Sequence, residues 1–449
     1  MPHEMPLAHP LTYVRESLLQ MGVRRFADHL CRHGKKLGHN LATNRTTVWK
    51  WETWGQVPDR AAQAVIADLL GIPPEYARPD TWPLWLPVWE VTGIHQPWTQ
   101  AGTVEVLSDL VRGGHMDRRG FLTITGASLS ALAVSWAEAP AAFASAAEGD
   151  RVTDRMLTSL EQRVTSLRDL DAEAGGAKLL EHARSDLALI TTMIKSARCT
   201  ETVRARLHSL AAEVAHLTGW MAYDSGLHSV GQQYYVAALR SARTAGDENL
   251  GAFVLAEMGV HASDGGHNRE RATLLETALE RRTGSLSALS RTYLYLHLAA
   301  AKAQLKDHRG ASVALQRSLG LWDRVEKERP AWLGWFGESQ IDSTRGKVAL
   351  WAGRPAEATR YLVSSVTASA PRDRAVRAGR LAEARLTGHD LDGALDAATH
   401  GVKLLEGGVA SGRAVDRLKE FSGRLKRYDT PAVRDFQDRL RALPVVEAA

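Results

Sequence analysis

The stretch Thr43-Asn44-Arg45-Thr46-Thr47-Val48-Trp49-Lys50-Trp51-Glu52 decides how the rest of the chain is interpreted. Read as a helix, it places the apolar Val48 and Trp51 on one face, three residues apart. Thr43 or Asn44 can accept a hydrogen bond from the first free N–H groups, so either residue can be the N-cap. We therefore predict a short helix with a buried two-residue anchor.

The outer face of this predicted helix carries cations and hydroxyl groups, including Arg45, Thr46, Trp49 and Lys50. Arginine and lysine can bind guanine edges or phosphates, and threonine can contact a phosphate or a thymine methyl group. This combination suits the major groove of DNA. An ordinary surface helix with one buried stripe is the alternative interpretation.

Basic residues concentrate around the same helix. The 449-residue chain has a formal net charge of +5, whereas residues 24–50 alone contain seven Lys or Arg residues and one Asp. A local basic patch in a nearly neutral protein is typical of a module that binds a polyanion, although a solvated face is the alternative. The predicted DNA-contacting residues are Arg24, Arg25, Lys35, Lys36, Arg45, Thr46, Thr47, Trp49 and Lys50.

Apolar periodicity predicts further helices over residues 11–21 and 23–33 before this stretch, and over 61–70 and 73–77 after it. The segment Gly34-Lys35-Lys36-Leu37-Gly38-His39-Asn40 is rich in Gly and Lys, which predicts a turn between helices.

Residues 11 to 78 resemble the Xre/Cro-like helix-turn-helix domain in this order of five helices, and in the sequences Trp51-Glu52 and Leu69-Leu70-Gly71-Ile72-Pro73. The resemblance implies that residues 43–52 form the recognition helix and that double-stranded DNA is the partner. The stretch from Leu30 to Arg45 departs from the family, because it is about ten residues longer than a helix-turn-helix needs. A basic loop over the phosphate backbone is the alternative role for it. Negative regulators of differentiation in Streptomyces-type actinobacteria are similar here.

Residues 81–99 form a connector rich in Trp and Pro. The prolines forbid a long helix. Exposing several indoles would be unfavourable, so we expect the connector to pack on a neighbouring domain. An aromatic ligand site is the alternative.

The segment Met116-Asp117-Arg118-Arg119-Gly120-Phe121-Leu122, with the apolar run that follows it to Trp136, resembles a twin-arginine export signal. The run is about sixteen residues long, short of the ~20 that span a bilayer. It also lies inside the chain, and similar actinobacterial regulators carry the same internal segment. We therefore predict a buried helix that joins two domains, with export or a membrane tether as the alternative.

Helical patterns with small residues fill the rest of the chain. The segment Leu217 to Leu239 looks like a tetratricopeptide repeat, which places small residues where two antiparallel helices touch. Similar positions recur at Gly231, Ala272, Ala311, Ala358 and Ala394. Their separations of 41, 39, 47 and 36 residues are looser than the ~34 of a standard repeat. We predict a superhelical stack of degenerate tetratricopeptide-like hairpins, with a loosely periodic helical bundle as the alternative.

In tetratricopeptide-like stacks, the first helix of each pair lines an inner groove. Extending the repeat along the chain predicts a groove for a ligand, peptide or protein partner, lined by Trp220, Tyr223, Glu257, His261, Tyr293, Ser343 and Lys347. Flat aromatics and a few polar groups suit recognition of such a molecule. Stacking between adjacent repeats is the alternative role for Trp220 and Tyr223.

Motifs for catalysis are missing from the sequence: we find no phosphate-binding loop, kinase motif set or serine-hydrolase elbow. Paired carboxylates such as Glu257 and Asp264 are expected on solvated helix faces. The two cysteines, Cys31 and Cys199, lack metal-ligand spacing, which favours a reducing cytoplasm. We therefore expect no enzyme activity, no cofactor and no metal site.

The sequence thus predicts an all-α chain in three parts. These are a helix-turn-helix domain over residues 1–80, the connector with an apolar linker helix over 81–150, and a tetratricopeptide-like domain over 151–449. The implied function is a cytoplasmic, sequence-specific DNA-binding regulator of transcription, whose repeats sense a peptide, a small signal or a protein partner. A homodimer is compatible with it, and no membrane partner is expected. The alternatives are a repeat scaffold that does not bind DNA, and a membrane-tethered or exported protein.

Overall fold

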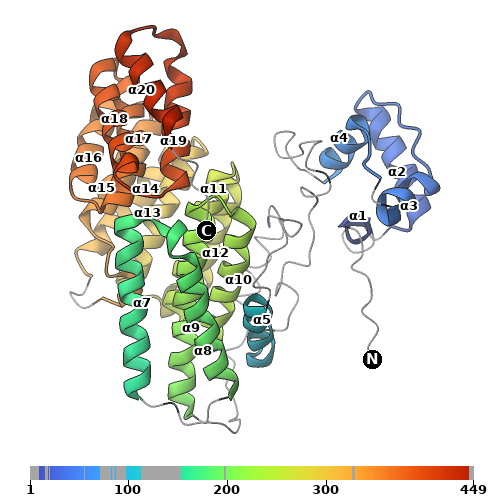
Figure 1. The fold of residues 1–449 in the computed structure, drawn as a ribbon, viewed down its shortest axis with the longest axis horizontal. Coiled ribbons are helices and arrows are strands. Elements are labelled where there is room, and N and C mark those ends of the chain that lie inside the picture. Colours follow the sequence, from blue (N-terminus) through green and yellow to red (C-terminus); the bar gives the residue numbers. More distant parts are fainter. Residues whose placement is uncertain are drawn as a thin grey trace. The chain divides into compact units, whose positions relative to one another are not determined.

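The computed structural model describes residues 10–15, 19, 21–54, 56–70, 82, 86, 98–112, 152, 154–196, 199–325 and 329–443. Within these residues the regular elements are helices, as the all-α prediction requires. The chain divides into two compact units: Met1–His95 with Gly114–Ile124 (unit 1), and Gln96–Gly113 with Thr125–Ala449 (unit 2). Figure 1 shows the helices of both units, each of which is described by itself.

The described helices of unit 1 are α1 (Pro10–Tyr13), α2 (Val23–Lys36), α3 (Arg45–Trp54) and α4 (Arg60–Leu69). Each helix contributes to one core, which includes Leu11, Val14, Phe26, Leu30, Val48, Trp51, Val65 and Ile66. Helix α4 begins at a capping residue, because the Asp59 carboxylate accepts a hydrogen bond from the Ala62 N–H at 2.7 Å.

Two residues of the Trp/Pro-rich connector, Trp82 and Leu86, are buried in the core of unit 1, as the expected packing requires. The end of the connector belongs to unit 2, and there the Trp98 ring lies 4.6 Å from the guanidinium of Arg240 in the same unit. The helix expected over 73–77, the other Trp and Pro residues of the connector, and the expected linker helix within 116–147 lie outside the described residues.

Helix boundaries in unit 1 differ from the prediction. Helix α1 ends at Tyr13, and Val14 and Arg15 form a π-helical turn, so the described helix is shorter than the predicted 11–21. Helix α2 continues to Lys36, so the prediction of a turn over 34–36 is wrong.

Gly34 lies inside α2, and the segment that follows the helix folds back across it. A Cβ atom at Gly34 would lie 3.1 Å from the His39 carbonyl oxygen and 3.2 Å from Leu41 Cγ. The Cys31 thiol lies within hydrogen-bond distance of the carbonyl oxygens of Leu41 and Thr43, at 3.3 and 3.2 Å. The glycine therefore permits a close approach and does not end the helix. Residues 37–44 connect α2 to α3 and contain no Lys or Arg, so the alternative of a basic loop is wrong and Lys35 and Lys36 belong to the end of α2.

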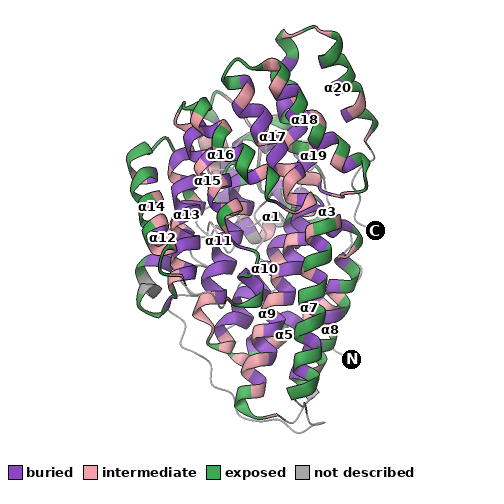
Figure 2. Ribbon diagram, turned by 90° about the vertical axis from the view of Figure 1, so that its left-hand side faces the viewer, coloured by how far each residue is buried: buried purple, intermediate pink, exposed green. Residues whose placement is uncertain are grey.

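Unit 2 is a succession of helices. They are α5 (Gln100–Arg112), α7 (Asp154–Ala174), η3 (Gly176–Lys178), α8 (Leu180–Ser196), α9 (Glu201–Asp224), α10 (His228–Ala245), α11 (Glu248–Asp264), α12 (Asn268–Arg282), η4 (Thr283–Ser285), α13 (Ala288–Gln304), α14 (His308–Trp322), η5 (Ala331–Leu333), α15 (Glu338–Trp351), α16 (Pro355–Thr367), α17 (Pro371–Thr387), α18 (Leu391–Glu406), α19 (Gly412–Arg424), η6 (Leu425–Arg427) and α20 (Pro431–Ala442). In Figure 2, α9, α10, α11 and α13 are largely buried, whereas α7 and α20 present broad exposed faces. Among the described residues, none of these helices combines the length and apolarity needed to cross a membrane.

Five helix pairs share one kind of turn. Within the pairs α9–α10, α11–α12, α13–α14, α15–α16 and α17–α18, three residues connect the helices, and each second helix packs along the first. The middle residue of every one of these turns has a positive φ: Gly226, Gly266, Lys306, Gly353 and His389. The first helices also pack against one another in succession, and we call them the inner layer.

Small residues bring the two helices of a pair together. A Cβ atom at Gly231 in α10 would lie 2.9 Å from the Gly219 carbonyl oxygen in α9. A Cβ at Gly346 in α15 would lie 2.5 Å from Leu362 Cγ in α16. The small residues found by sequence analysis, Gly231, Ala272, Ala311, Ala358 and Ala394, are all buried in the second helices.

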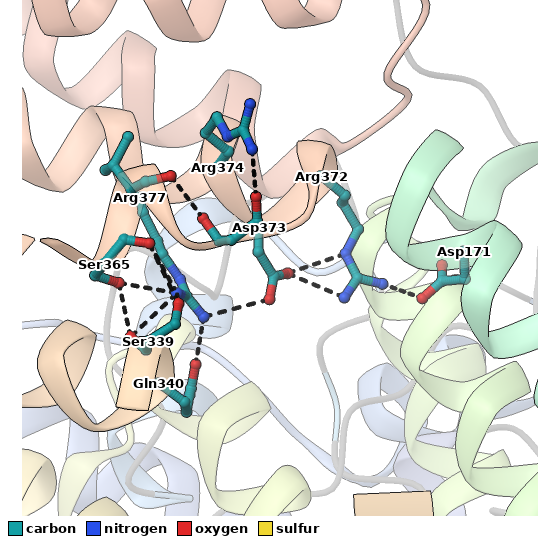
Figure 3. A network of polar contacts seen from close by, with 10 residues as sticks. Asp171, Ser339, Gln340, Ser365, Arg372, Asp373, Arg374 and Arg377 are labelled. Carbon is teal, nitrogen blue, oxygen red and sulfur yellow. Dashed lines mark hydrogen bonds and ion pairs between the residues drawn. The ribbon is translucent and has the colours of Figure 1, made fainter. Parts of the chain in front are cut away.

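The beginning and the end of this succession touch. The Ala410 N–H donates to the Ala174 carbonyl oxygen at 2.8 Å. The Asp224 carboxylate, at the end of α9, accepts from Ser411 Oγ at 2.9 Å and from Arg413 Nε at 2.6 Å. Figure 3 shows a second link, in which Arg372 of α17 lies between Asp171 of α7 and Asp373. We call these interactions the closure contact.

Gly175→Ala is predicted to open the closure contact. Gly175 has a φ of +84°, and its Cβ would lie 2.0 Å from the Ala410 carbonyl oxygen. Backbone strain of ~1–3 kcal/mol and overpacking of ~1–3 kcal/mol should add together. Urea unfolding gives the loss of stability, and hydrogen exchange should become faster at residues 224–226 and 410–413.

Gly226→Ala is the matched control, because Gly226 has a φ of +82° but nothing within 4 Å of its Cβ position. Its loss of unfolding free energy should come from backbone strain alone. Equal losses of unfolding free energy in the two variants would show that the close approach of Ala410 to Gly175 places no constraint on this part of the fold.

Candidate functional site

Helix α3 is held by an apolar anchor and a capping residue. Val48 is fully buried and Trp51 is 3% exposed, as their spacing predicts. The Asn44 side-chain oxygen accepts a hydrogen bond from the Thr47 N–H at 3.0 Å. Of the two N-caps that the sequence allowed, Asn44 is therefore the one that the structure uses.

A buried ion pair orients the second half of α3. The Arg15 guanidinium donates to both carboxylate oxygens of Glu52, at 2.8 and 3.0 Å, and to the Met21 carbonyl oxygen at 3.0 Å. The two charged side chains are 5% and 6% exposed. A bidentate pair constrains direction as well as distance, so it restricts rotation of α3 about its axis. Sequence analysis missed this role of Glu52, because its partner is 37 residues away and no local pattern links them.

The outer residues of α3 form the candidate contact with nucleic acid, and we call them the α3 surface: Arg45, Thr46, Thr47, Trp49 and Lys50. Arg45 and Thr46 are exposed, Thr47 and Lys50 are half-buried, and Trp49 is 44% exposed. The anchor and the ion pair thus leave a cation, a hydroxyl group and an indole facing solvent.

The remaining predicted contact residues belong to α2 and form two separate groups. Arg24 and Arg25 are exposed in its first turn, and Lys35 and Lys36 are exposed in its last. At a rise of about 1.5 Å per residue, roughly 18 Å separates Arg24 from Lys36. Because Cys31 contacts Thr43, the beginning of α3 lies beside the second half of α2, which is the half that carries the two lysines.

A second candidate site is the inner layer of unit 2. The seven residues predicted to line a groove lie on four of its helices, namely Trp220 and Tyr223 on α9, Glu257 and His261 on α11, Tyr293 on α13, and Ser343 and Lys347 on α15. Trp220 and Lys347 are half-buried, whereas the other five side chains are buried.

Contacts between neighbouring first helices join these residues. The Tyr223 ring stacks on the His261 ring with centroids 4.5 Å apart, and it meets the Trp220 ring at 5.5 Å. The Tyr293 hydroxyl donates a hydrogen bond to Glu257, and the Tyr223 hydroxyl donates to Asp264. Stacking between adjacent repeats therefore describes the contact of Tyr223 with His261, whereas the Trp220 ring meets Tyr223 edge-on within α9.

The expectation of a solvated helix face is wrong for Glu257, whereas Asp264 is exposed as expected. Glu257 is 3% exposed and accepts from Tyr293. Asp264 pairs with Arg417, which is 153 residues away on α19. The physical reason is that the first helices pack on one another, so a face that is polar in sequence is turned toward polar partners on other helices.

Burial changes the protonation behaviour of this layer. It lowers the pKa of His261 to about 3, so this imidazole is neutral near pH 7. Burial, with the neighbouring Glu257 carboxylate, raises the pKa of the Tyr293 hydroxyl well above its usual value. Burial, followed by the charges of Arg271 and Arg380, lowers the pKa of Lys347 from 10.5 to about 7.

A groove of about 510 Å³ lies elsewhere in unit 2, among α14, α15 and α16. Leu315 and Val348 are among the residues that line it. Arg345, which also lines it, donates a hydrogen bond to the Tyr361 hydroxyl at 2.7 Å and lies 4.1 Å from the centroid of that ring. None of the residues that sequence analysis predicted for the ligand groove lines it.

Comparison with protein-family models and with curated proteins finds no match for this chain.

Glu52→Gln is predicted to loosen unit 1. It leaves Arg15 buried without its anionic partner, and breaking a buried pair in this way costs about 3–5 kcal/mol. Hydrogen exchange of peptides from α3 should accelerate by at least about 100-fold, since 1.4 kcal/mol corresponds to a factor of ten.

Glu181→Gln on α8 is the control, because Glu181 is 59% exposed in its pair with Arg184. An exposed pair contributes about 0–1 kcal/mol, so exchange in α8 should hardly change. Unchanged exchange in α3 of the Glu52 variant would show that the ion pair does not hold this helix.

The pKa of Lys347 predicts a pH dependence. The folded chain begins to release this proton near pH 7, whereas the unfolded chain keeps it up to about pH 10.5. Between these values the unfolded state binds more protons, so this group makes unit 2 more stable as pH rises. The unfavourable burial of the ammonium is fully present below pH 7.

Urea unfolding of the wild type and of Lys347→Met, followed by circular dichroism from pH 6.5 to pH 9, tests this dependence. The variant should be more stable at pH 6.5, and its advantage should shrink toward pH 9. A constant difference between the two proteins would contradict the shifted pKa.

Proposed function

We propose that this chain is a sequence-specific DNA-binding regulator of transcription, with an Xre/Cro-like helix-turn-helix in unit 1 and tetratricopeptide-like repeats in unit 2. The observation that carries the proposal is the division of α3 into two sides. Val48 and Trp51 are buried and the Glu52 side chain is only 6% exposed, while Arg45, Thr46 and Trp49 are exposed. Such a helix offers its polar side to the major groove without losing its anchor.

Charge around α3 supports the same proposal. Lys35 and Lys36 are exposed at the end of α2 that lies beside the beginning of α3. Arg24 and Arg25, at the far end of α2, are spaced to reach a different part of a phosphate backbone. Phosphate contacts of this kind position a helix, and contacts from the α3 surface to base edges would supply the sequence preference.

The five helix pairs support repeats as the second part of the proposal. Their three-residue turns share a positive φ at the middle residue, and small residues lie at the contacts within the pairs. In two of these turns, Asp307 and Asp390 accept hydrogen bonds from the N–H groups of Gly310 and Gly393, at 2.8 and 2.9 Å. Recurrence of one turn at separations of 40, 40, 47 and 36 residues is typical of a degenerate repeat array.

In the proposed mechanism, a peptide, small signal or protein partner binds the inner layer and favours one arrangement of the helix pairs. A ligand shifts such an equilibrium only through its different affinity for the two arrangements. The inner layer suits this role because its polar side chains link different helix pairs, as Tyr293 links α13 to Glu257 on α11.

One observation favours a scaffold that binds protein instead of DNA. Trp49 on α3 is 44% exposed, and tryptophan is enriched at protein interfaces. Salt separates the two functions, because counterion release makes DNA affinity fall steeply with salt concentration. If the full chain does not bind a DNA duplex even at low salt, the scaffold function is favoured.

Arg45→Ala and Lys50→Ala are each predicted to weaken binding to a duplex identified by genome-wide capture with the tagged chain. A lost base contact costs about 1–3 kcal/mol, and the loss should differ between matched and scrambled duplexes. Fluorescence anisotropy measures both affinities.

Arg155→Ala, an exposed arginine on α7, is the control for loss of one positive charge. Hydrogen exchange in α3 checks that the helix is intact in every variant. If both α3 variants bind the captured duplex as the wild type does, α3 is not the recognition helix.

A further inference from the structure

Arg271 on α12 is a buried cation whose partners are all neutral. Its side chain is 5% exposed. The guanidinium donates to Gln304 Oε1 at 3.2 Å, to Ser263 Oγ at 3.3 Å and to His297 Nδ1 at 3.2 Å. Among the described residues, no carboxylate lies within ion-pair distance of it. Buried arginines are ordinarily paired with an anion, so this one lacks its usual partner.

His297 on α13 adds an unused hydrogen-bond donor. A guanidinium can only donate, so the Nδ1 atom facing Arg271 accepts and the ring proton is on Nε2. The His297 side chain is 4% exposed, and Nε2 is buried without a hydrogen-bond partner. The Tyr293 ring, tilted by 41° with its centroid 4.4 Å away, restricts the orientation of the imidazole.

Lys347 on α15 supplies a second cation without a counter-charge. It is half-buried, and within the described part of the chain its ammonium has neither a hydrogen bond nor an ion pair. Its helix packs against α13, which carries His297. The charges of the three groups also affect one another: after burial, Arg271 is the largest cause of the lowered pKa of Lys347, and Lys347 follows burial and Arg271 in lowering the pKa of His297.

The nearest carboxylates are already engaged. Asp264 accepts from Tyr223 and from Arg417, and Glu257 accepts from Tyr293. The three groups on α12, α13 and α15 therefore form a cationic site with donors to spare and no anion of its own. We call Arg271, His297 and Lys347 the cationic triad.

We propose that the cationic triad binds the anionic group, a carboxylate or a phosphate, of a small ligand that enters the inner layer. The inference rests on the proposed sensing function of unit 2 and assigns its ligand a chemical class. The guanidinium and the ammonium provide charge, and the Nε2–H group provides a directed donor. Because the triad spans three helix pairs, one bound anion links α12, α13 and α15.

The test uses the purified full chain without DNA, so that its outcome does not depend on whether α3 binds a duplex. Thermal unfolding is followed by circular dichroism in a chloride buffer of constant ionic strength, while sodium phosphate or sodium acetate replaces chloride. We expect a saturable rise in Tm with at least one of the two anions, because a ligand that binds only the folded state stabilises it. The anion that acts distinguishes a phosphate group from a carboxylate.

Lys347→Met separates binding from structure, because the two roles predict opposite signs. If the triad binds an anion, the variant without added anion is at least as stable as the wild type, and its response to the anion falls at least tenfold. If Lys347 is merely structural, the variant is destabilised and responds to the anion as the wild type does. Arg271→Lys, which keeps the charge but loses the planar fork, should show a weakened response.

Lys302→Met is the matched control, because Lys302 lies on α13 and is already neutralised by Glu276 at 2.6 Å. It should keep the full response to the anion. The proposal is overturned if neither anion raises the Tm of the wild type in a titration to tens of millimolar, or if the Lys302 and Lys347 variants lose the response equally.

Discussion

Close approach of the two helices within each pair is the constraint on which the rest of unit 2 depends. Where Gly231 meets Gly219, no space remains for a Cβ atom, and the same holds where Gly346 meets Leu362. Larger residues there would separate the helices and change how each pair packs on the next. Because the pair contact uses small residues, the long polar side chains of the first helices lie where neighbouring first helices meet, and so they contact one another.

Some buried charged side chains in and beside the inner layer have a partner of opposite charge, and one does not. Asp224 pairs with Arg413, and Asp264 pairs with Arg417, so these charges have partners that offset their desolvation. Arg271, on the second helix α12, contacts this layer through Ser263 and His297, and its hydrogen-bond partners are all neutral. Stability alone would favour an apolar residue of similar volume at such a position. An anion bound by the cationic triad, as proposed above, would supply the missing counter-charge.

Unit 1 uses a buried charge in a different way. The pair of Arg15 with Glu52 is bidentate and well matched, and Glu52 lies in the same helix as the Val48 and Trp51 anchor. The buried side chains of Val48, Trp51 and Glu52 restrict the rotation of this short helix as well as its position. The α3 surface is therefore presented by a helix with one orientation, which is what recognition of a base edge requires.

The sequence by itself determined the features that depend on local periodicity. These are the all-α class of the described residues, the burial of Val48 and Trp51, and the small residues at which helices approach. Period and residue size are readable in a window of one or two helices.

Only the tertiary structure decided which distant groups meet. Gly34 lies inside a helix, and the chain at residue 39 passes so close that a Cβ atom at position 34 would be crowded. Glu257 is buried because α13 brings Tyr293 to it. Asp264 meets Arg417 across 153 residues because the end of the helical succession returns to its beginning. The path of the stack sums many small rotations between helix pairs, and no local sequence pattern encodes that sum.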